Sequence, residues 1–306
     1  MRVTRRLILA STAALAPGLA RGAVHDAHSL RLTHDGGRST DYRVLAPGRS
    51  GPLGVVLFSH GAASANTLYD RILQPWAAAG FMVIAPNHVD AAGSTAPKVA
   101  AAELWRTRVQ DLTAPLLQRA PFEAFATGLG AKLDWRKTCA AGHSFGAAVA
   151  QSLAGARMEG IAAGSVAHAG VASVLCLSPP GPRPNFVSAN TWAPVTIPAL
   201  LQTGDADILP GFIDDWRAHK QGFEDQPGRA RWLIVGSGVD HYFGGLICRL
   251  DDGPKATAQA PALAATTHIT TDFLLAYGRG DRLALGRLGK AARARADSPV
   301  LSLTRV

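Results

Sequence analysis

The chain has 306 residues, of which 47% are hydrophobic and 17% are charged, a composition that supports a sizeable core and excludes a disordered chain. The formal net charge is +9, but the excess lies at the two ends. Residues 1–23 hold four arginines and no acid, and residues 279–306 hold seven basic residues against two aspartates. The body between them is neutral, which argues against nucleic acid as a partner.

Residues 1–23 are typical of an export signal. Arg5-Arg6 precede an apolar run over residues 7–19, which has the length of a signal core and is too short to span a bilayer. Cleavage is expected after Ala20 or Ala23. The paired arginines resemble a twin-arginine signal, with an ordinary secretory signal as the alternative. We therefore expect a periplasmic or secreted protein without an integral membrane span.

The rest of the chain alternates apolar strands with helical patterns. A hairpin is expected to join Ser29–His34 to Tyr42–Ala46. Further short apolar runs predict buried strands at Val55–Ser59, Phe81–Pro86, Thr138–Gly142, Val171–Ser178, Ala199–Thr203 and Trp232–Val235. Helical spacing covers Leu68–Ala79, Lys98–Arg119, Ala147–Ala156 and Pro261–Tyr277. This alternation predicts an α/β fold, with a mostly parallel central sheet and helices on both faces.

The predicted domain covers residues 24–278 and has little or no lid, because only about 20 residues separate the strands on either side of the Pro179–Pro198 loop. Residues 279–306 are interpreted as a basic, solvated tail, with contact to an anionic surface as the alternative. Cys139, Cys176 and Cys248 form no close pair, so no metal or redox motif is expected, although one disulfide remains open. We expect a monomer.

The strongest chemical signal is Gly142-His143-Ser144-Phe145-Gly146. A strand precedes this G-x-S-x-G pattern and a helix of small residues follows it, which is the setting of a strained turn that exposes a serine hydroxyl. Glycines flank the serine because side chains there would collide with neighbouring backbone. The pattern therefore predicts Ser144 as a nucleophile at a helix N-terminus.

A serine hydroxyl needs a base, and the partners are expected after later strands, in the order acid and then histidine. Asp205 and Asp207 follow the strand at 199–203. We choose Asp207, because the turn needs a few residues to reach back, and interpret Asp205 as a turn residue bonded to its own backbone. His241 follows the last strand. His88 could line the pocket, and His219 is interpreted as a surface or packing residue.

The turn Ser59-His60-Gly61-Ala62 follows the strand at 55–59. Its backbone N–H groups are expected beside the nucleophile, so that the N–H groups of Ala62 and Phe145 hold the oxyanion of a tetrahedral intermediate. His60 is interpreted as structural rather than catalytic.

These four motifs together resemble the α/β-hydrolase superfamily over roughly residues 40–278. Within it the chain looks most similar to dienelactone-hydrolase-like and platelet-activating-factor-acetylhydrolase-like serine esterases, and next to secreted polyester hydrolases. The resemblance implies a triad of Ser144, Asp207 and His241 and an oxyanion hole at Ala62 and Phe145. Dienelactone hydrolases carry a cysteine nucleophile, which weakens dienelactones as the substrate of a chain that has Ser144.

The expected reaction is cleavage of a small-molecule or polymer carboxylic ester through an acyl-enzyme, with no cofactor and no metal. Aromatic side chains that could wall the pocket are Tyr69, Trp192, Tyr242 and Phe243. Trp192 is the first choice because it lies in a proline-rich loop above the sheet. Three alternatives stay open: an amidase or peptidase, an acyltransferase, and a non-catalytic binding protein of the same fold.

Overall fold

The computed structural model describes residues 28–48, 50–160, 166–188, 190–294 and 299–306. Within these ranges the strands form one sheet in the order β1-β2-β4-β3-β5-β6-β7-β8-β9. The strands are β1 (His28–Thr33), β2 (Ser39–Leu45), β3 (Gly51–Ser59), β4 (Phe81–Pro86), β5 (Ala131–His143), β6 (Val171–Leu177), β7 (Ala199–Gly204), β8 (Arg231–Gly236) and β9 (Leu301–Arg305). The run from β4 through β3 to β8 is parallel, and β1, β2 and β9 pair antiparallel at the edges. The expected mostly parallel sheet is confirmed.

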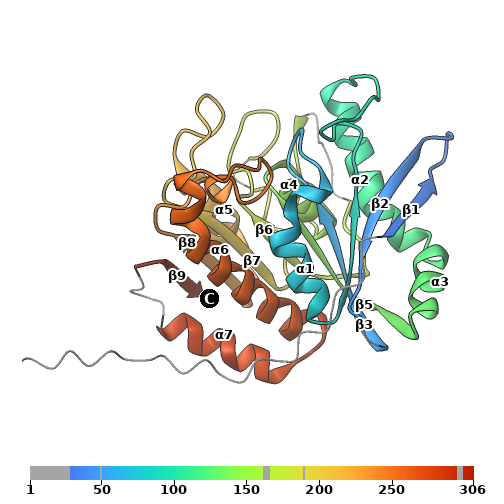
Figure 1. Cartoon of the computed structure of the whole chain (residues 1–306). Coiled ribbons are helices and arrows are strands. Elements are labelled where there is room, and N and C mark those ends of the chain that lie inside the picture. The colour runs from blue at the N-terminus through green and yellow to red at the C-terminus, as the bar shows by residue number, and fades with distance from the viewer. Residues whose placement is uncertain (1–27, 49, 161–165, 189, 295–298) are drawn as a thin grey trace, which may run out of the picture.

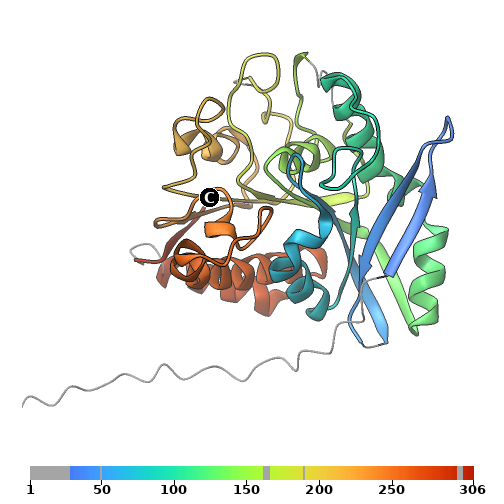
Figure 2. The ribbon, with the colours of Figure 1, turned by 45° about the horizontal axis from the view of Figure 1, so that its top comes forward.

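Helices cover both faces of this sheet (Figures 1 and 2). The helices are α1 (Asp70–Ala78), α2 (Ala101–Leu117), α3 (Ala120–Gly128), α4 (Phe145–Leu153), α5 (Gln221–Asp225), α6 (Pro254–Phe273) and α7 (Arg282–Ala294). One apolar core packs α2, α3 and α4 against one face, and a second packs α1, α6 and α7 against the other. Strands buried on both faces therefore read as continuous apolar runs, as in β4, where all six residues are buried.

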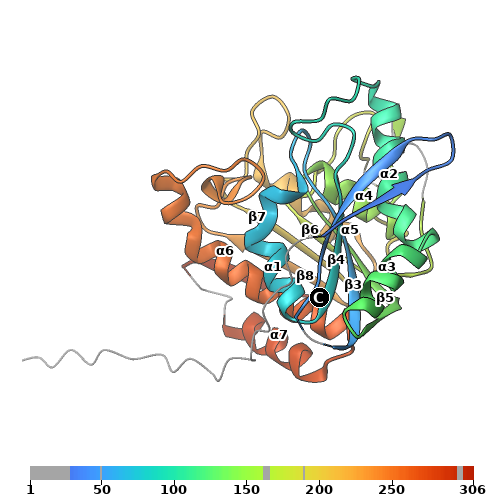
Figure 3. The same ribbon diagram turned by 45° about the vertical axis from the view of Figure 1, so that its right-hand side comes forward.

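The sequence interpretation of residues 279–306 as a solvated tail is wrong. Helix α7 buries Ala284 and Leu288, and Arg287 is bonded at 2.6 Å to Asp272 of α6. Strand β9 then pairs with β8 and closes one edge of the sheet (Figure 1), and the β1–β2 hairpin forms the opposite edge (Figures 1 and 3). The sequence did not indicate this packing, because basic residues dominate the exposed side of α7. The domain thus continues to the last strand.

Three further expectations concern the export signal, membrane spans and the cysteines. The predicted export signal at residues 1–23 lies outside the described residues. Across the part of the chain that is described, no helix combines the length and apolarity needed to cross a bilayer. Cys139, Cys176 and Cys248 are all buried and free, so the structure pairs none of them in a disulfide.

Candidate active site

The turn between β5 and α4 holds Ser144 in a strained conformation. Its φ of 53° and ψ of −123° lie outside the regions that a side chain normally allows. A Cβ on Gly142 would lie 2.3 Å from the carbonyl oxygen of Gly146, and a Cβ on Gly146 would lie 2.1 Å from that of Ser59. Both glycines are therefore required by close backbone approach, and the turn presents Ser144 at the N-terminus of α4.

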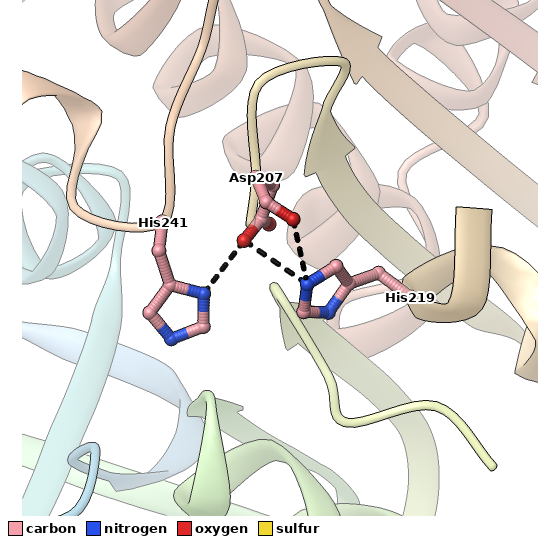
Figure 4. Close-up of side chains that lie close together, drawn as sticks. All are labelled: Asp207, His219 and His241. Carbon is pink, nitrogen blue, oxygen red and sulfur yellow. Dashed lines mark hydrogen bonds and ion pairs between the residues drawn. The ribbon is translucent and has the colours of Figure 1, made fainter. Parts of the chain in front are cut away.

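Asp207 and His241 meet beside this turn. Asp207 lies three residues beyond β7 and His241 five residues beyond β8, and His241 Nδ1 donates to Asp207 Oδ1 at 2.7 Å. Both side chains are buried. Because the carboxylate can only accept, the proton of a neutral His241 lies on Nδ1, and Nε2 keeps a free lone pair. Figure 4 shows this second nitrogen on the side of the ring away from Asp207.

The environment depresses the pKa of both groups. Burial alone would raise the pKa of Asp207, but hydrogen bonds from His219 and His241 hold it well below its ordinary range. Burial lowers the pKa of His241 to about 4, against the opposite pull of Asp207. At neutral pH the pair is therefore a carboxylate and a neutral imidazole, which is the state that a general base requires.

His219 is a third member of this cluster, and it is buried rather than on the surface. It lies on the 3-10 helix Trp216–Lys220. Its Nε2 lies 3.0 Å from Asp207 Oδ1 and 3.2 Å from the carbonyl oxygen of Asp207, so that the carboxylate sits between two imidazole rings (Figure 4). The donor atoms of the three residues lie within 4.8 Å of one another, a spacing that a metal ion could bridge. The 2.7 Å bond between His241 and Asp207 instead fits a hydrogen-bonded cluster.

Asp205 has a different partner from the one expected. It is exposed, and its Oδ1 accepts from the N–H of Gly238 at 2.6 Å rather than from its own turn. Asp205 therefore ties the loop that carries Asp207 to the loop that carries His241.

The oxyanion turn is held from below by a buried arginine. Arg108 of α2 donates to the carbonyl oxygens of His60 at 2.7 Å and Gly61 at 3.0 Å. It also pairs with Asp90, whose carboxylate accepts from the N–H of Ala63 at 3.1 Å. These contacts engage the carbonyls of His60 and Gly61 and the N–H of Ala63, but not the N–H of Ala62.

Ala62 and Phe145 line the same cavity as Ser144 and His241. In the described ranges, neither the Ala62 N–H nor the Phe145 N–H has a hydrogen-bond partner. Two unpartnered donors beside the nucleophile are the arrangement that stabilises a developing oxyanion. His60 is buried and accepts from the N–H of His88, which agrees with a structural interpretation.

The elbow is also tied to the base through His143 and Tyr69. His143 Nε2 lies 2.9 Å from the carbonyl oxygen of His241 and therefore donates to it. His143 Nδ1 then accepts from the Tyr69 hydroxyl at 3.0 Å, and the same hydroxyl accepts from the Gly61 N–H at 2.9 Å. Tyr69 thus links the elbow to the oxyanion turn without lining the cavity.

The cavity above Ser144 has a volume of about 580 Å³. Its wall is mainly apolar and aromatic and includes Phe145, Phe186, Phe212 and Tyr242. The loop after β6 and the loop after β7 supply half of the lining residues, and among the described residues no helix lies between β6 and β7. Tyr242 lies where the sequence predicted it.

Three other aromatic predictions are wrong. Trp192, Tyr69 and Phe243 are each at most 1% exposed and pack into the two cores, and none contributes to the cavity wall. His88, which could have lined it, is also buried elsewhere. Aromatic residues serve core and pocket equally well, so their positions in a loop do not distinguish the two roles.

Cys248 is a wall residue that the sequence did not single out. Burial would raise the pKa of its thiol, but contacts with His143, Tyr69 and Ser64 outweigh burial and lower the pKa to about 7. The thiol therefore forms part of the polar support of the elbow.

A family comparison agrees with this geometry. Residues 32–174 match the chlorophyllase family, a family of ester hydrolases with this fold. No curated protein matches the chain significantly. The matched segment covers β2, the oxyanion turn and the elbow, while Asp207 and His241 lie beyond it. With its mostly parallel sheet, serine elbow and family match, the chain belongs to the α/β-hydrolase superfamily.

Proposed function

We propose that the protein is a serine esterase that cleaves carboxylic esters through an acyl-enzyme. The observation that carries the proposal is the convergence on one cavity of the strained Ser144, the Asp207-bound His241 and the two unpartnered N–H groups of Ala62 and Phe145. Each group meets a separate requirement of acyl transfer: a nucleophile, a base and an oxyanion site.

In the proposed reaction, Nε2 of His241 takes the proton of the Ser144 hydroxyl as Oγ attacks the ester carbonyl carbon. The N–H groups of Ala62 and Phe145 stabilise the oxyanion that forms. His241 then returns the proton to the leaving alkoxide, and the ester C–O bond breaks. Water, deprotonated by the same histidine, releases the acyl group. Asp207 orients His241 and stabilises its charged form throughout.

The cavity supports esters of modest size with apolar substituents, since its volume is about 580 Å³ and its wall is rich in phenylalanine. Binding sites for small molecules commonly fall in this size range. The proposed place of action is outside the cytoplasm, on the basis of the N-terminal pattern, and N-terminal sequencing of the exported protein would locate the cleavage point.

The proposal is tested by mixing the purified protein with p-nitrophenyl butyrate and following p-nitrophenol release together with the intact mass. We expect turnover and a transient mass increase of one butyryl group. Parallel assays with butyryl p-nitroanilide and with added alcohols separate an amidase and an acyltransferase from an esterase. A protein that turns over none of these substrates and gains no acyl group would not be a serine hydrolase.

A further inference from the structure

Two arginines stand in the wall of the cavity that holds Ser144. They are Arg183, from the loop after β6, and Arg249, from the segment after His241. No aspartate or glutamate among the described residues lines this cavity. The wall therefore carries two positive charges in an otherwise largely apolar surface, and the mechanism proposed above uses neither of them.

Both guanidinium groups are held in place by aromatic rings of the same wall. The guanidinium carbon of Arg183 lies 3.8 Å from the ring centre of Phe212, and Arg183 also donates to the Phe212 carbonyl oxygen at 2.7 Å. The guanidinium carbon of Arg249 lies 4.9 Å from the ring centre of Tyr242. Stacking of this kind fixes the plane of the group and leaves its remaining N–H donors available.

The two acids that flank His241, Asp207 and Asp240, already have partners. Across the described ranges, neither arginine forms an ion pair with a carboxylate. Asp207 is bound to its two histidines. Asp240 accepts from the N–H groups of Tyr242 at 3.0 Å and Gly244 at 2.8 Å. A cation beside an apolar cavity and without a counter-charge is best satisfied by an anionic ligand.

We propose that Arg183 and Arg249 form a subsite for an anionic group of the substrate. The preferred substrate is then an ester that also bears a carboxylate or a phosphate. The apolar wall holds the chain between the two groups, and the guanidinium forks hold the anion. This inference rests on the proposed esterase function and deepens it, because it names the class of ester that the same cavity selects.

The test compares two esters of equal chain length, the mono-p-nitrophenyl ester of adipic acid, which is anionic, and p-nitrophenyl hexanoate, which is neutral. We expect a higher kcat/KM for the anionic ester at low salt. In Arg183→Gln and in Arg249→Gln this preference should fall roughly ten-fold, since a hydrogen bond to a charged group contributes about 1.5–3 kcal/mol. Hydrolysis of the neutral ester should change much less than hydrolysis of the anionic ester.

Arg183→Lys keeps the charge and should retain part of the preference. Arg217→Gln is the matched control, because Arg217 also stacks on an aromatic ring, that of Trp216, but lies outside the cavity wall. Inhibition of neutral ester hydrolysis by octanoate and by octyl phosphate shows whether the subsite prefers a carboxylate or a phosphate. Equal hydrolysis of both esters, or a preference unchanged in both glutamine variants, would overturn the subsite. If the wild-type protein hydrolysed neither ester, the esterase proposal itself would be wrong.

A different observation carries a second inference, about His219. Its Nδ1 lies 2.7 Å from the carbonyl oxygen of Pro179, and its Nε2 faces the carboxylate and the carbonyl oxygen of Asp207. All of these oxygens can only accept, so both ring nitrogens must carry protons. His219 is therefore a buried imidazolium paired with Asp207.

We infer that His219 is a positioning residue that fixes Asp207 and keeps His241 neutral. The ring centres of His219 and His241 are 5.7 Å apart, so a positive charge on one opposes protonation of the other. The other groups that face His241 are Asp207, His143 and Tyr242. Of these groups, only Asp207 favours the protonated form of His241. The positive charge of His219 offsets part of that electrostatic effect.

His219→Gln tests this role through the pH profile of kcat/KM. The variant should remain active, and the pH at which activity falls on the acid side should move up by roughly one unit. His268→Gln is the control, because His268 is exposed on α6 with 71% of its side chain accessible, and its profile should match the wild type. A merely structural role would lower activity or stability and leave the acid limb in place, and that result would overturn the inference.

Discussion

Two groups of a serine, a histidine and an aspartate stand out among the described residues, and they differ in their access to the cavity. In the first, the Ser59 hydroxyl lies 2.8 Å from His88 Nε2, and His88 Nδ1 lies 2.9 Å from Asp111 Oδ2. All three side chains are at most 1% exposed, and none lines the cavity above Ser144. In the second, His241 binds Asp207 at 2.7 Å, and His241 and Ser144 share the cavity wall.

The difference lies in the backbone and in access, since the side chains are the same. Ser59 is the last residue of strand β3, whereas Ser144 is held at a φ of 53° at the start of a helix. Asp111 is further bound by Thr40 and Arg38, so the buried group is a satisfied polar network. It also reaches the oxyanion turn, because the His88 N–H donates to His60. We therefore expect the buried group to support the site and the group at the cavity to carry out the proposed reaction.

The largest expected contrast is between the two serines. Ser144→Ala should lower kcat for p-nitrophenyl butyrate by about 10⁴-fold or more, the range of single triad deletions, with unfolding by urea unchanged. Ser59→Ala should stay within about ten-fold of wild-type activity and lose about 1–3 kcal/mol of stability, because His88 Nε2 loses its donor. Substantial turnover by Ser144→Ala would assign the wrong nucleophile.

The next contrast concerns the buried acid. Asp111→Asn should lower the free energy of unfolding by about 3–5 kcal/mol, because it leaves the charge of Arg38 without its partner in a buried network. The folded variant should still hydrolyse ester. Asp41→Asn breaks an exposed ion pair with Arg31 and should have a much smaller effect in the same urea titration. Equal effects of the two variants would mean that the Asp111 network is not structural.

Gly146, next to Ser144 in the elbow, lies against the backbone of Ser59, so its substitution tests how the two groups depend on each other. A Cβ on Gly146 would lie 2.1 Å from the Ser59 carbonyl oxygen, so Gly146→Ala should push the elbow off β3 and cost about 2–4 kcal/mol along with much of the activity. Gly128→Ala at the end of α3, where nothing lies within 4 Å, is the matched control and should change neither. A fully active Gly146→Ala would show that the elbow tolerates displacement.

The smallest expected effect is a difference between the pH dependence of kcat/KM and the pH dependence of stability. Burial lowers the pKa of His241 to about 4, so the base stays neutral, and kcat/KM stays high, until pH falls toward that value. The pKa values of His88, Asp111 and Asp207 are also lowered. The unfolded chain therefore binds more protons, and stability declines as pH falls below about 6.5. Circular dichroism at each pH, beside the rate, separates the two curves; coincident curves would contradict the assignment.

The sequence predicted the parts of the site that follow strand ends. Ser144, Asp207 and His241 each come a few residues after an apolar run, and the topology of a parallel sheet brings such positions together. His219, Arg108 and Asp111 were not predictable, because their partners lie on other elements and no local pattern marks them. Arg108, for example, binds His60, which is 48 residues away.

The errors have a physical cause as well. Residues 279–306 were interpreted as a tail because charge outweighed the weak apolar spacing of α7, although Ala284 and Leu288 complete a core. Trp192 was assigned to the pocket from its loop, but loops between parallel strands also return side chains to the core. In both cases tertiary packing decided what the local sequence left open.

The most direct test of the account is to label the protein with a fluorophosphonate and map the modified peptide. The reagent forms an Oγ–P bond with an activated serine as the P–F bond breaks, and it needs the same base and oxyanion donors as an ester. We expect one label, on Ser144, that disappears in Ser144→Ala and persists in Ser59→Ala. A label on Ser59, or no label on a protein that hydrolyses esters, would show that Ser144 is not the nucleophile.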